Sequence, residues 1–342
     1  MVTINDVANK VGVSASTVSR VLSGGNNRIS EATKRAVLKA IDELGYRPNV
    51  WAQSFSKSQT NTIGLVIPKS GSGSFFLIQL MERCQELAEL SNKFLMITMA
   101  ADDPLYTIQS LMDRRCDGIL FYSSSRYFNQ LSQNDQLSEF IEKSPKPIVI
   151  INGHLSNQQD VCFDIDQAAV ARNGVEYLIN KGHKDIAYIS GQLNDFTARS
   201  RLEGYEQALR QADITPNTIL IVEGGRKFHE GYEACLQLLN RNYKFTAIAC
   251  FNDQIAIGAL KALHEKNISV PDQVSILGLD DENILNFLNP TISSISVPKE
   301  IVINRAFNIL LNKMHLPLLE VEDTGEILIT ERNSVINITP NN

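Results

Sequence analysis

Residues 3–23, TINDVANKVGVSASTVSRVLS, contain the clearest folding signals in the N-terminal part of this chain. Its spacing predicts two short helices joined by a tight turn. Thr3, with Asp6 three residues later, fits an N-cap followed by a capping-box acid. Gly12 can take the positive φ that ends the first helix, and Ser14 then caps the second. We expect the second helix to face inward with Val18, Val21 and Leu22, and outward with Ala15, Ser16, Thr17, Ser19 and Arg20.

A third helix is predicted over residues 30–45, SEATKRAVLKAIDELG, with Ser30 at its start and Gly45 at its stop. Its expected buried face consists of Val37, Leu38, Ile41 and Leu44. Three small helices, the second of them short and polar on its outer side, indicate a helix-turn-helix DNA reader. The alternative is an ordinary three-helix bundle, since periodicity and caps report helices and not ligands.

The distribution of charge favours the DNA-binding interpretation. The whole chain carries a net charge of −6, but residues 1–58 hold eight Lys or Arg and four Asp or Glu, a balance of +4. The remainder therefore carries −10. A basic head on an acidic body confines the attraction for phosphate to the first sixth of the chain.

Length and composition exclude several classes of protein. A chain of 342 residues is too long for one ordinary domain and suggests two or three. No run approaches the roughly 18 apolar residues of a membrane span, and a start containing Asn5 and Asp6 is no signal peptide. We therefore expect a cytoplasmic protein that is not associated with a membrane. The five cysteines are scattered without a CxxC pair and read as small core residues rather than a disulfide frame or a metal site.

Beyond a polar linker at 54–62, short apolar runs alternate with amphipathic segments. This alternation predicts parallel sheets covered by helices, arranged as two doubly wound α/β lobes. A cleft between such lobes, at the carboxyl ends of their strands, is the usual place for a small molecule. The expected strands are 62–67, 94–99, 118–122, 147–152, 186–190, 219–223, 247–251 and 274–279, and expected helices include 76–91, 166–181, 197–211 and 253–267.

Several motifs occur together and in order. They are I-N-D-V-A, G-V-S-x-x-T-V-S-R-V-L and Y-R-P-N-x-x-A near the N-terminus, followed by GHKDIAYISG (182–191), FNDQIAIGAL (251–260) and VSILGLDD (274–281). With these motifs the chain closely resembles the lactose- and galactose-repressor family along its whole length. A set of motifs in the expected order is far more specific than any one of them.

The resemblance implies a helix-turn-helix headpiece at 1–46, a hinge helix and linker at 47–60, and a periplasmic-binding-protein-like core at 61–342. In such a core the chain crosses between the lobes three times, which gives a first lobe of about 61–158 and 291–321 and a second of about 159–290 and 322–342. The chain ends at VINITPNN without the leucine-heptad tail of some relatives, so a homodimer is expected.

The family pattern also implies which residues read DNA. In that pattern Ala15, Ser16 and Arg20 would touch base edges. From their position and their hydroxyl groups, we expect Ser14, Thr17 and Ser19 to contact phosphates instead. Arg20 suits guanine O6 and N7, whereas a serine hydroxyl discriminates weakly and is otherwise explained by solvation or capping. Two symmetric headpieces imply a pseudo-palindromic operator.

In the hinge the family pattern assigns minor-groove contacts to Asn49, Ala52 and Phe55. Phe55 stands where relatives usually carry leucine, and it remains an accepted wedge between base steps. Trp51 is also unusual at its position. A helix this short is marginal in water, so the segment is expected to be a partly apolar, flexible linker away from DNA.

The resemblance places effector-binding residues at Asn152, Arg201, Asn252 and Asp280, and we expect Phe75 and Phe76, after the GSGS stretch, to supply an apolar platform. Arginine, asparagine and aspartate together suit vicinal hydroxyls, and an aromatic ring suits the face of a sugar. Asn152 stands where sugar-responsive relatives often carry aspartate. The competing interpretations are that Asn252, or Asp280 with Asp281, caps the following helix, and that Arg201 pairs with Glu203 or a surface acid. Both phenylalanines could also be core residues.

Enzyme interpretations find little support. The histidines show no metal spacing, and no nucleophile elbow, Walker loop or dinucleotide fingerprint follows a strand, so no metal and no cofactor are expected. GSGS (71–74) and GGRK (224–227) are too short to cradle a phosphate. The sequence therefore predicts a repressor released from its operator by a sugar-type effector. The alternatives are a regulator whose ligand, for instance a purine, strengthens DNA binding, and a solute-binding receptor without a regulatory role.

Overall fold

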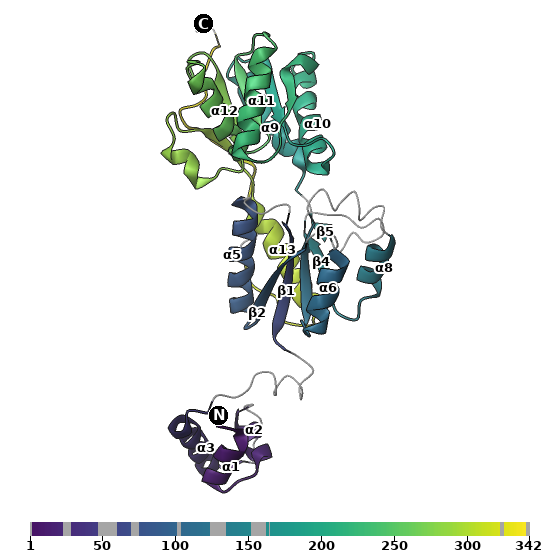
Figure 1. Ribbon diagram of the computed structural model, residues 1–342, viewed down its shortest axis with the longest axis vertical. Helices are drawn as coiled ribbons and strands as arrows, with labels where there is room; N and C mark the ends of the chain where they lie inside the picture. The colour runs from purple at the N-terminus through teal and green to yellow at the C-terminus, as the bar shows by residue number, and fades with distance from the viewer. Residues whose placement is uncertain are drawn as a thin grey trace. The chain divides into compact units, whose positions relative to one another are not determined.

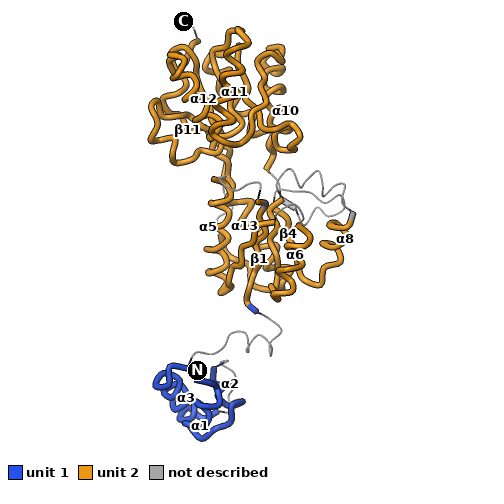
Figure 2. Tube along the Cα trace, viewed as in Figure 1, with its two compact units in different colours: residues 1–60 blue, residues 61–342 orange. Residues whose placement is uncertain are grey.

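The chain falls into two compact units, Met1–Thr60 and Asn61–Asn342 (Figure 2). The computed structural model describes residues 2–22, 29–46, 60–69, 75–100, 104–123, 135–151, 162–163, 165–321 and 325–339. Within these ranges, no helix combines the length and the apolar character that crossing a membrane requires.

The first unit contains the helices α1 (Ile4–Val11), α2 (Ala15–Leu22) and α3 (Glu31–Leu44). Its predicted start and stop signals are confirmed. The backbone N–H of Thr3 donates to Asp6 Oδ2 at 2.7 Å, which completes the capping box. Gly12 and Gly45 end α1 and α3 with φ of 74° and 62°, values at which a residue with a Cβ is strained.

The buried stripe of α3 differs by one position from the predicted one. Val37 and Ala40 are buried against Val7 and Val18, whereas the side chain of Leu38 is 53% exposed. The prediction for Leu38 is therefore wrong. A helix turns about 100° per residue, so a stripe that runs through 37, 40, 41 and 44 leaves position 38 beside it.

The first lobe of the second unit is built on a parallel sheet in the order β2-β1-β3-β4-β5. Ile63, Leu65 and Ile67 of β1 pack with residues of α5 and α13, while Val66 packs with residues of α6 and α8 on the other side. These helices are labelled in Figure 1. The elements are β1 (Thr62–Pro68), β2 (Phe94–Ala100), β3 (Gly118–Tyr122), β4 (Ile148–Ile151), β5 (Cys162–Phe163), α5 (Phe75–Leu90), α6 (Pro104–Asp113), α8 (Asp135–Lys143) and α13 (Lys299–Lys313).

The second lobe has a sheet in the order β11-β10-β9-β8-β6-β7, which is parallel except for the pair β10 and β11. Helices α9 and α10 cover one face and α11 and α12 the other. The strands are β6 (Ile186–Ser190), β7 (Ile221–Glu223), β8 (Ala247–Cys250), β9 (Ser275–Leu279), β10 (Ser293–Ser296) and β11 (Leu328–Thr330). The helices are α9 (Gln167–Asn180), α10 (Phe196–Gln211), α11 (Phe228–Asn240) and α12 (Asp253–Glu265), with short 3₁₀ turns η3 (Thr218–Leu220) and η4 (Asn283–Phe287).

These sheets confirm the predicted fold class, a small helical headpiece followed by two doubly wound α/β lobes. The predicted lobe boundaries need two corrections. Cys162–Phe163 pairs with β4 and belongs to the first lobe, although the prediction began the second lobe near 159. Ser293–Ser296 pairs with β9 and belongs to the second lobe, although the prediction returned to the first near 291. Hydrogen bonding between strands, and not local pattern, decides which sheet a short segment joins.

Candidate functional site

The outer side of α2 is the candidate DNA-reading surface. Ser16, Ser19 and Arg20 are exposed there, as predicted, whereas Ala15 and Thr17 are half-buried. The prediction that Ala15 lies fully outside is corrected, because its methyl group packs against the headpiece core. The surface thus offers a guanidinium and hydroxyl groups in a small area.

Ser14 has the capping role that its position predicts. Its Oγ accepts from the backbone N–H of Thr17 at 3.2 Å and lies 2.8 Å from the Oγ of Ser16 and 2.9 Å from the Oγ1 of Thr17. The hinge residues Asn49, Ala52 and Phe55, and the core residue Asn152, lie outside the described residues.

Arg201 lies in α10 and is 7% exposed. Its Nε donates to Gln167 Oε1 at 2.9 Å, and its guanidinium also donates to the backbone carbonyl of Phe251. Burial lowers the pKa of Arg201, and the nearby charge of Asp280 acts in the opposite direction. The alternative pairing with Glu203 is wrong, because the Glu203 carboxylate accepts from Gln207 on the helix surface.

Asn252 is the N-cap of α12. Its Oδ1 accepts from the backbone N–H of Ile255 at 2.9 Å, and its Nδ2 donates to the carbonyl of Arg226 at 3.1 Å. Capping is therefore confirmed. It also fixes the orientation of the Asn252 amide at the carboxyl end of β8.

Asp280 follows β9 with a φ of 115°, a backbone region that favours glycine. Its N–H donates to the carbonyl of Ile295 at 2.9 Å, and its Oδ1 lies 3.3 Å from Lys299 Nζ. The neighbouring Asp281 pairs with Arg332 at 2.8 Å, and the N-cap position of η4 belongs to Glu282. The capping alternative is therefore wrong for both aspartates.

The two phenylalanines at the start of α5 have different surroundings. The ring of Phe75 meets that of Phe228, at the start of α11, edge to face with 6.3 Å between centroids. Phe76 packs against the first-lobe core and lies 5.2 Å from the ring of Tyr122. Phe75 therefore reaches the second lobe, whereas Phe76 serves mainly the core of the first.

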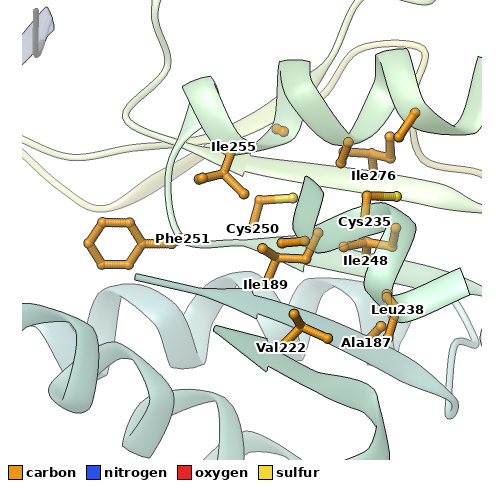
Figure 3. Close-up of a cluster of buried hydrophobic side chains, with 14 of the residues drawn as sticks. Ala187, Ile189, Val222, Cys235, Leu238, Ile248, Cys250, Phe251, Ile255 and Ile276 are labelled. Atoms are coloured by element: carbon orange, nitrogen blue, oxygen red, sulfur yellow. The ribbon is translucent and has the colours of Figure 1, made fainter. Parts of the chain in front are cut away.

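Two further residues of this site, Arg226 and Phe251, are not predicted by the sequence motifs. The guanidinium carbons of Arg201 and Arg226 lie 4.7 and 5.0 Å from the centre of the Phe251 ring. Arg226 also forms a close ion pair with Asp195, the N-cap of α10. Figure 3 shows the Phe251 ring at the end of the buried cluster, beyond Cys250 and Ile248. GGRK directly follows a predicted strand, so its position offered a signal for Arg226.

Arg201, Arg226, Phe251, Asn252 and Asp280 therefore gather at the carboxyl ends of the second-lobe strands, a group that we name the strand-end cluster. It combines two guanidinium groups over the Phe251 ring with an amide that donates to the Arg226 carbonyl and a carboxylate whose charge acts on Arg201. Such a set can both donate and accept hydrogen bonds to a polar ligand. Within the part of the chain that the structure describes, no three His, Cys, Asp or Glu side chains gather as metal ligands do.

Comparison with known proteins identifies relatives of both units. Residues 3–49 match the bacterial regulatory proteins of the lacI family, and residues 175–335 match a periplasmic-binding-protein-like domain. The HTH-type transcriptional regulator AscG of Escherichia coli (strain K12) is 37% identical over 301 residues, which cover 87% of this chain and 88% of that protein. The HTH-type transcriptional repressor PurR of Haemophilus influenzae (strain PittEE) is 33% identical over 345 residues, with 99% and 96% covered.

A solved structure is similar to the core. The sugar-binding transcriptional regulator of the LacI family from Escherichia coli, crystallised with phosphate, superposes with a TM-score of 0.71 at 31% identity. The match covers 82% of this chain and 99% of that one.

Proposed function

This chain belongs to the lacI family of bacterial regulatory proteins and is a DNA-binding transcriptional repressor, not an enzyme, and we propose that a sugar-type molecule bound between its lobes releases it from its operator. The observation that carries the proposal is the strand-end cluster. Arg201 contacts Phe251, Asn252 follows Phe251 in the chain, and the charge of Asp280 acts on Arg201, although the three residues come from different parts of the second lobe.

The chemistry of the cluster favours a hydroxylated ligand. A sugar hydroxyl donates to a carboxylate such as Asp280 and accepts from a guanidinium such as Arg201. A site that hydrogen-bonds hydroxyl groups discriminates against a ligand that lacks them. Phe75 and Phe228 add apolar surface for the face of a ring. One similar structure is that of a protein described as sugar-binding.

A second candidate is a regulator whose ligand strengthens DNA binding. The similarity to PurR extends over 99% of this chain, and an aromatic pair such as Phe75 and Phe228 also suits a flat base. A solute-binding receptor without regulatory role has no use for the helix-turn-helix unit. We therefore retain induction by a sugar as the main proposal.

On DNA, we infer that Ala15, Ser16 and Arg20 contact base edges and that Ser14, Thr17 and Ser19 contact phosphates. Asn49, Ala52 and Phe55 would enter the minor groove of a pseudo-palindromic operator in the cytoplasm. Trp51 is the single tryptophan of the chain, so its fluorescence should change on the operator and stay constant on random duplex.

We further propose a homodimer. β2 is an edge strand, and its side chains Phe94, Ile97 and Met99 are exposed. An exposed apolar edge is the kind of surface that a second copy covers. Sedimentation of F94E/M99E should show a monomer where the wild type sediments as a dimer; an unchanged dimer would exclude this surface.

The test of function begins with selection of the operator from random duplexes. Operator affinity is then measured with methyl β-D-glucoside, cellobiose, glucose 6-phosphate and hypoxanthine in turn. We expect one carbohydrate to weaken binding about tenfold in the wild type and to have no effect on D280N. Stronger operator binding with hypoxanthine would favour the second candidate, and no selected operator at all would refute the repressor function.

A further inference from the structure

Lys299 occupies the point where the chain returns from the second lobe to the first. It is the first residue of α13, which packs on the first sheet, and it follows β10 of the second sheet by three positions. Its side chain is only 7% exposed. A lysine is almost never buried to this extent unless its charge is compensated by partners.

The ionic and hydrogen-bonding partners of Lys299 belong to the second lobe. Its Nζ lies 3.3 Å from Asp280 Oδ1, 3.4 Å from the Asp280 carbonyl and 3.3 Å from Glu282 Oε1. Asp280 is also a member of the strand-end cluster. One ammonium group therefore joins the proposed ligand site to the start of a first-lobe helix. We name this contact of Lys299 with Asp280 and Glu282 the junction.

Helix α5 takes part in the same junction. Gln79 Nε2 donates to Glu282 Oε2 at 3.4 Å, and the ammonium of Lys299 lies 5.8 Å from the ring of Phe76. Further along, Arg83 Nε donates to Asn304 Oδ1 at 2.8 Å and ties α5 to α13. A displacement of Lys299 would therefore reach both helices that cover this face of the first sheet.

Asp253 holds the second-lobe side of the junction. Its Oδ2 accepts from the backbone N–H of Glu282 at 2.8 Å, and its Oδ1 accepts from Ser294 Oγ at 2.6 Å. Asp280 and Glu282 thus share the single buried ammonium of Lys299, and Asp253 fixes the backbone of Glu282 beside it. Because the carboxylates outnumber their cation, a ligand donor offered to Asp280 competes with Lys299 for it.

We propose that Lys299 is the positioning residue that holds Asp280 in the absence of an effector and transmits occupancy of the site to α5 and α13. This rests on the proposed function, in which Asp280 contacts the effector. When a ligand hydroxyl donates to Asp280, Lys299 shifts toward Glu282 and the first turns of α13 and α5 move with it. The coupling between ligand and operator depends on this exchange of partners.

The test uses the full-length variants K299M and K299R, with K261M as the matched control. Lys261 pairs with Glu265 on the exposed face of α12, so its loss removes a lysine without touching the junction. The probe is whichever of methyl β-D-glucoside, cellobiose or glucose 6-phosphate weakens operator binding by the wild type. We expect K299M to bind it at least as tightly as the wild type while the ratio of operator Kd values, with and without probe, falls at least about fivefold. K299R should retain most of this ratio.

Hydrogen–deuterium exchange supplies a readout that needs no effector. In ligand-free K299M, we expect the first turns of α5 and α13 to exchange faster than in the wild type and in K261M. Unchanged exchange there overturns the inference. An unchanged operator ratio, or loss of probe binding together with the ratio, also overturns it. If no probe changes operator binding by the wild type, the proposed function fails. The exchange data then decide alone whether Lys299 holds α5 and α13 in place.

Discussion

The guanidinium carbon of Arg201 lies 4.7 Å from the centre of the Phe251 ring, and the same guanidinium donates to the backbone carbonyl of Phe251. Arg201 therefore holds one residue both through its ring and through its main chain. With the additional bond to Gln167, it fixes α10 and α9 to the carboxyl end of β8. A flexible ammonium group cannot reproduce this forked, planar arrangement.

Substitution of Arg201 by lysine should consequently lower stability. R201K leaves Gln167 or the Phe251 carbonyl without its donor, and we expect the free energy of unfolding to fall by about 1–3 kcal/mol. Urea unfolding followed by circular dichroism measures it. R210K is the control on the same helix, where Arg210 makes an exposed pair with Glu206, and it should change stability by no more than about 0.5 kcal/mol. Equal effects of the two variants would contradict the structural role of Arg201.

Asn252 can be tested as a helix cap. N252A removes the acceptor for the N–H of Ile255, so we expect a loss of about 1 kcal/mol in unfolding free energy. N252D retains an acceptor oxygen at the same place and should lose less. Chemical denaturation of the wild type, N252A and N252D measures these differences in the free energy of unfolding. Identical losses in N252A and N252D would mean that the bond to the Arg226 carbonyl, and not the cap, provides the stability.

Gly258 allows α12 to approach α11 closely. A Cβ at this position would lie 2.7 Å from the backbone nitrogen of Tyr232 and closer still to the carbonyl of Phe228. G258A should therefore force the helices apart and destabilise the core by about 1–3 kcal/mol. Because α11 begins at Phe228, the ring contact with Phe75 should also change. Thermal unfolding compares G258A with K261A on the exposed face of the same helix, and equal midpoints would exclude the close approach.

Asp253 should make stability depend on pH. Burial, and then the charge of Asp280, raise the pKa of Asp253 from 3.8 to about 7. Between these values the folded protein binds a proton that the unfolded chain has lost, so this group's contribution to stability falls as pH rises from about 4 to 7. Lys299 opposes the shift and so limits its size.

The measurement is the unfolding free energy of the wild type and D253N from pH 5 to 8. Relative to D253N, the wild type should lose stability as the pH rises. Burial lowers the pKa of His183, which gives an opposite slope below about 6.5, but this residue is present in both proteins and cancels in the difference. Parallel curves for the two proteins would show that Asp253 ionises normally.

Arg20 is the residue whose loss should change sequence preference. R20A should cost about 1–3 kcal/mol and relax selection at one position of each half-site, because one base edge loses its donor. S19A, a proposed phosphate contact, should instead weaken all sequences alike. Binding to a library of single-base operator variants separates the two effects. If R20A lost the same affinity on every operator variant, Arg20 would not be a base-reading residue.

Local signals in the sequence were sufficient for much of the fold. Thr3, Asp6 and Gly12 act within one or two helical turns, so the start and end of α1 follow from residues that are neighbours in the chain. Strands such as β3 and β6 were predicted with their correct bounds, since a run of buried apolar residues between polar ends reflects burial on both faces. Asn252 was recognised both as a cap and as a site candidate for the same reason.

Other features of the fold and of the candidate site depend on contacts between distant parts of the chain. The membership of Ser293–Ser296 in the second sheet depends on hydrogen bonds to β9, and the exposure of Leu38 depends on which side of α3 meets Val7 and Val18. Lys299 gave no signal in the sequence, because its partners Asp280 and Glu282 become neighbours only after the chain has closed the second sheet and turned back to the first. The positions of most helices and strands could be predicted from local sequence, since these depend on contacts within a few residues. Which charged side chains share a buried site was decided by packing between distant segments, which no local pattern records.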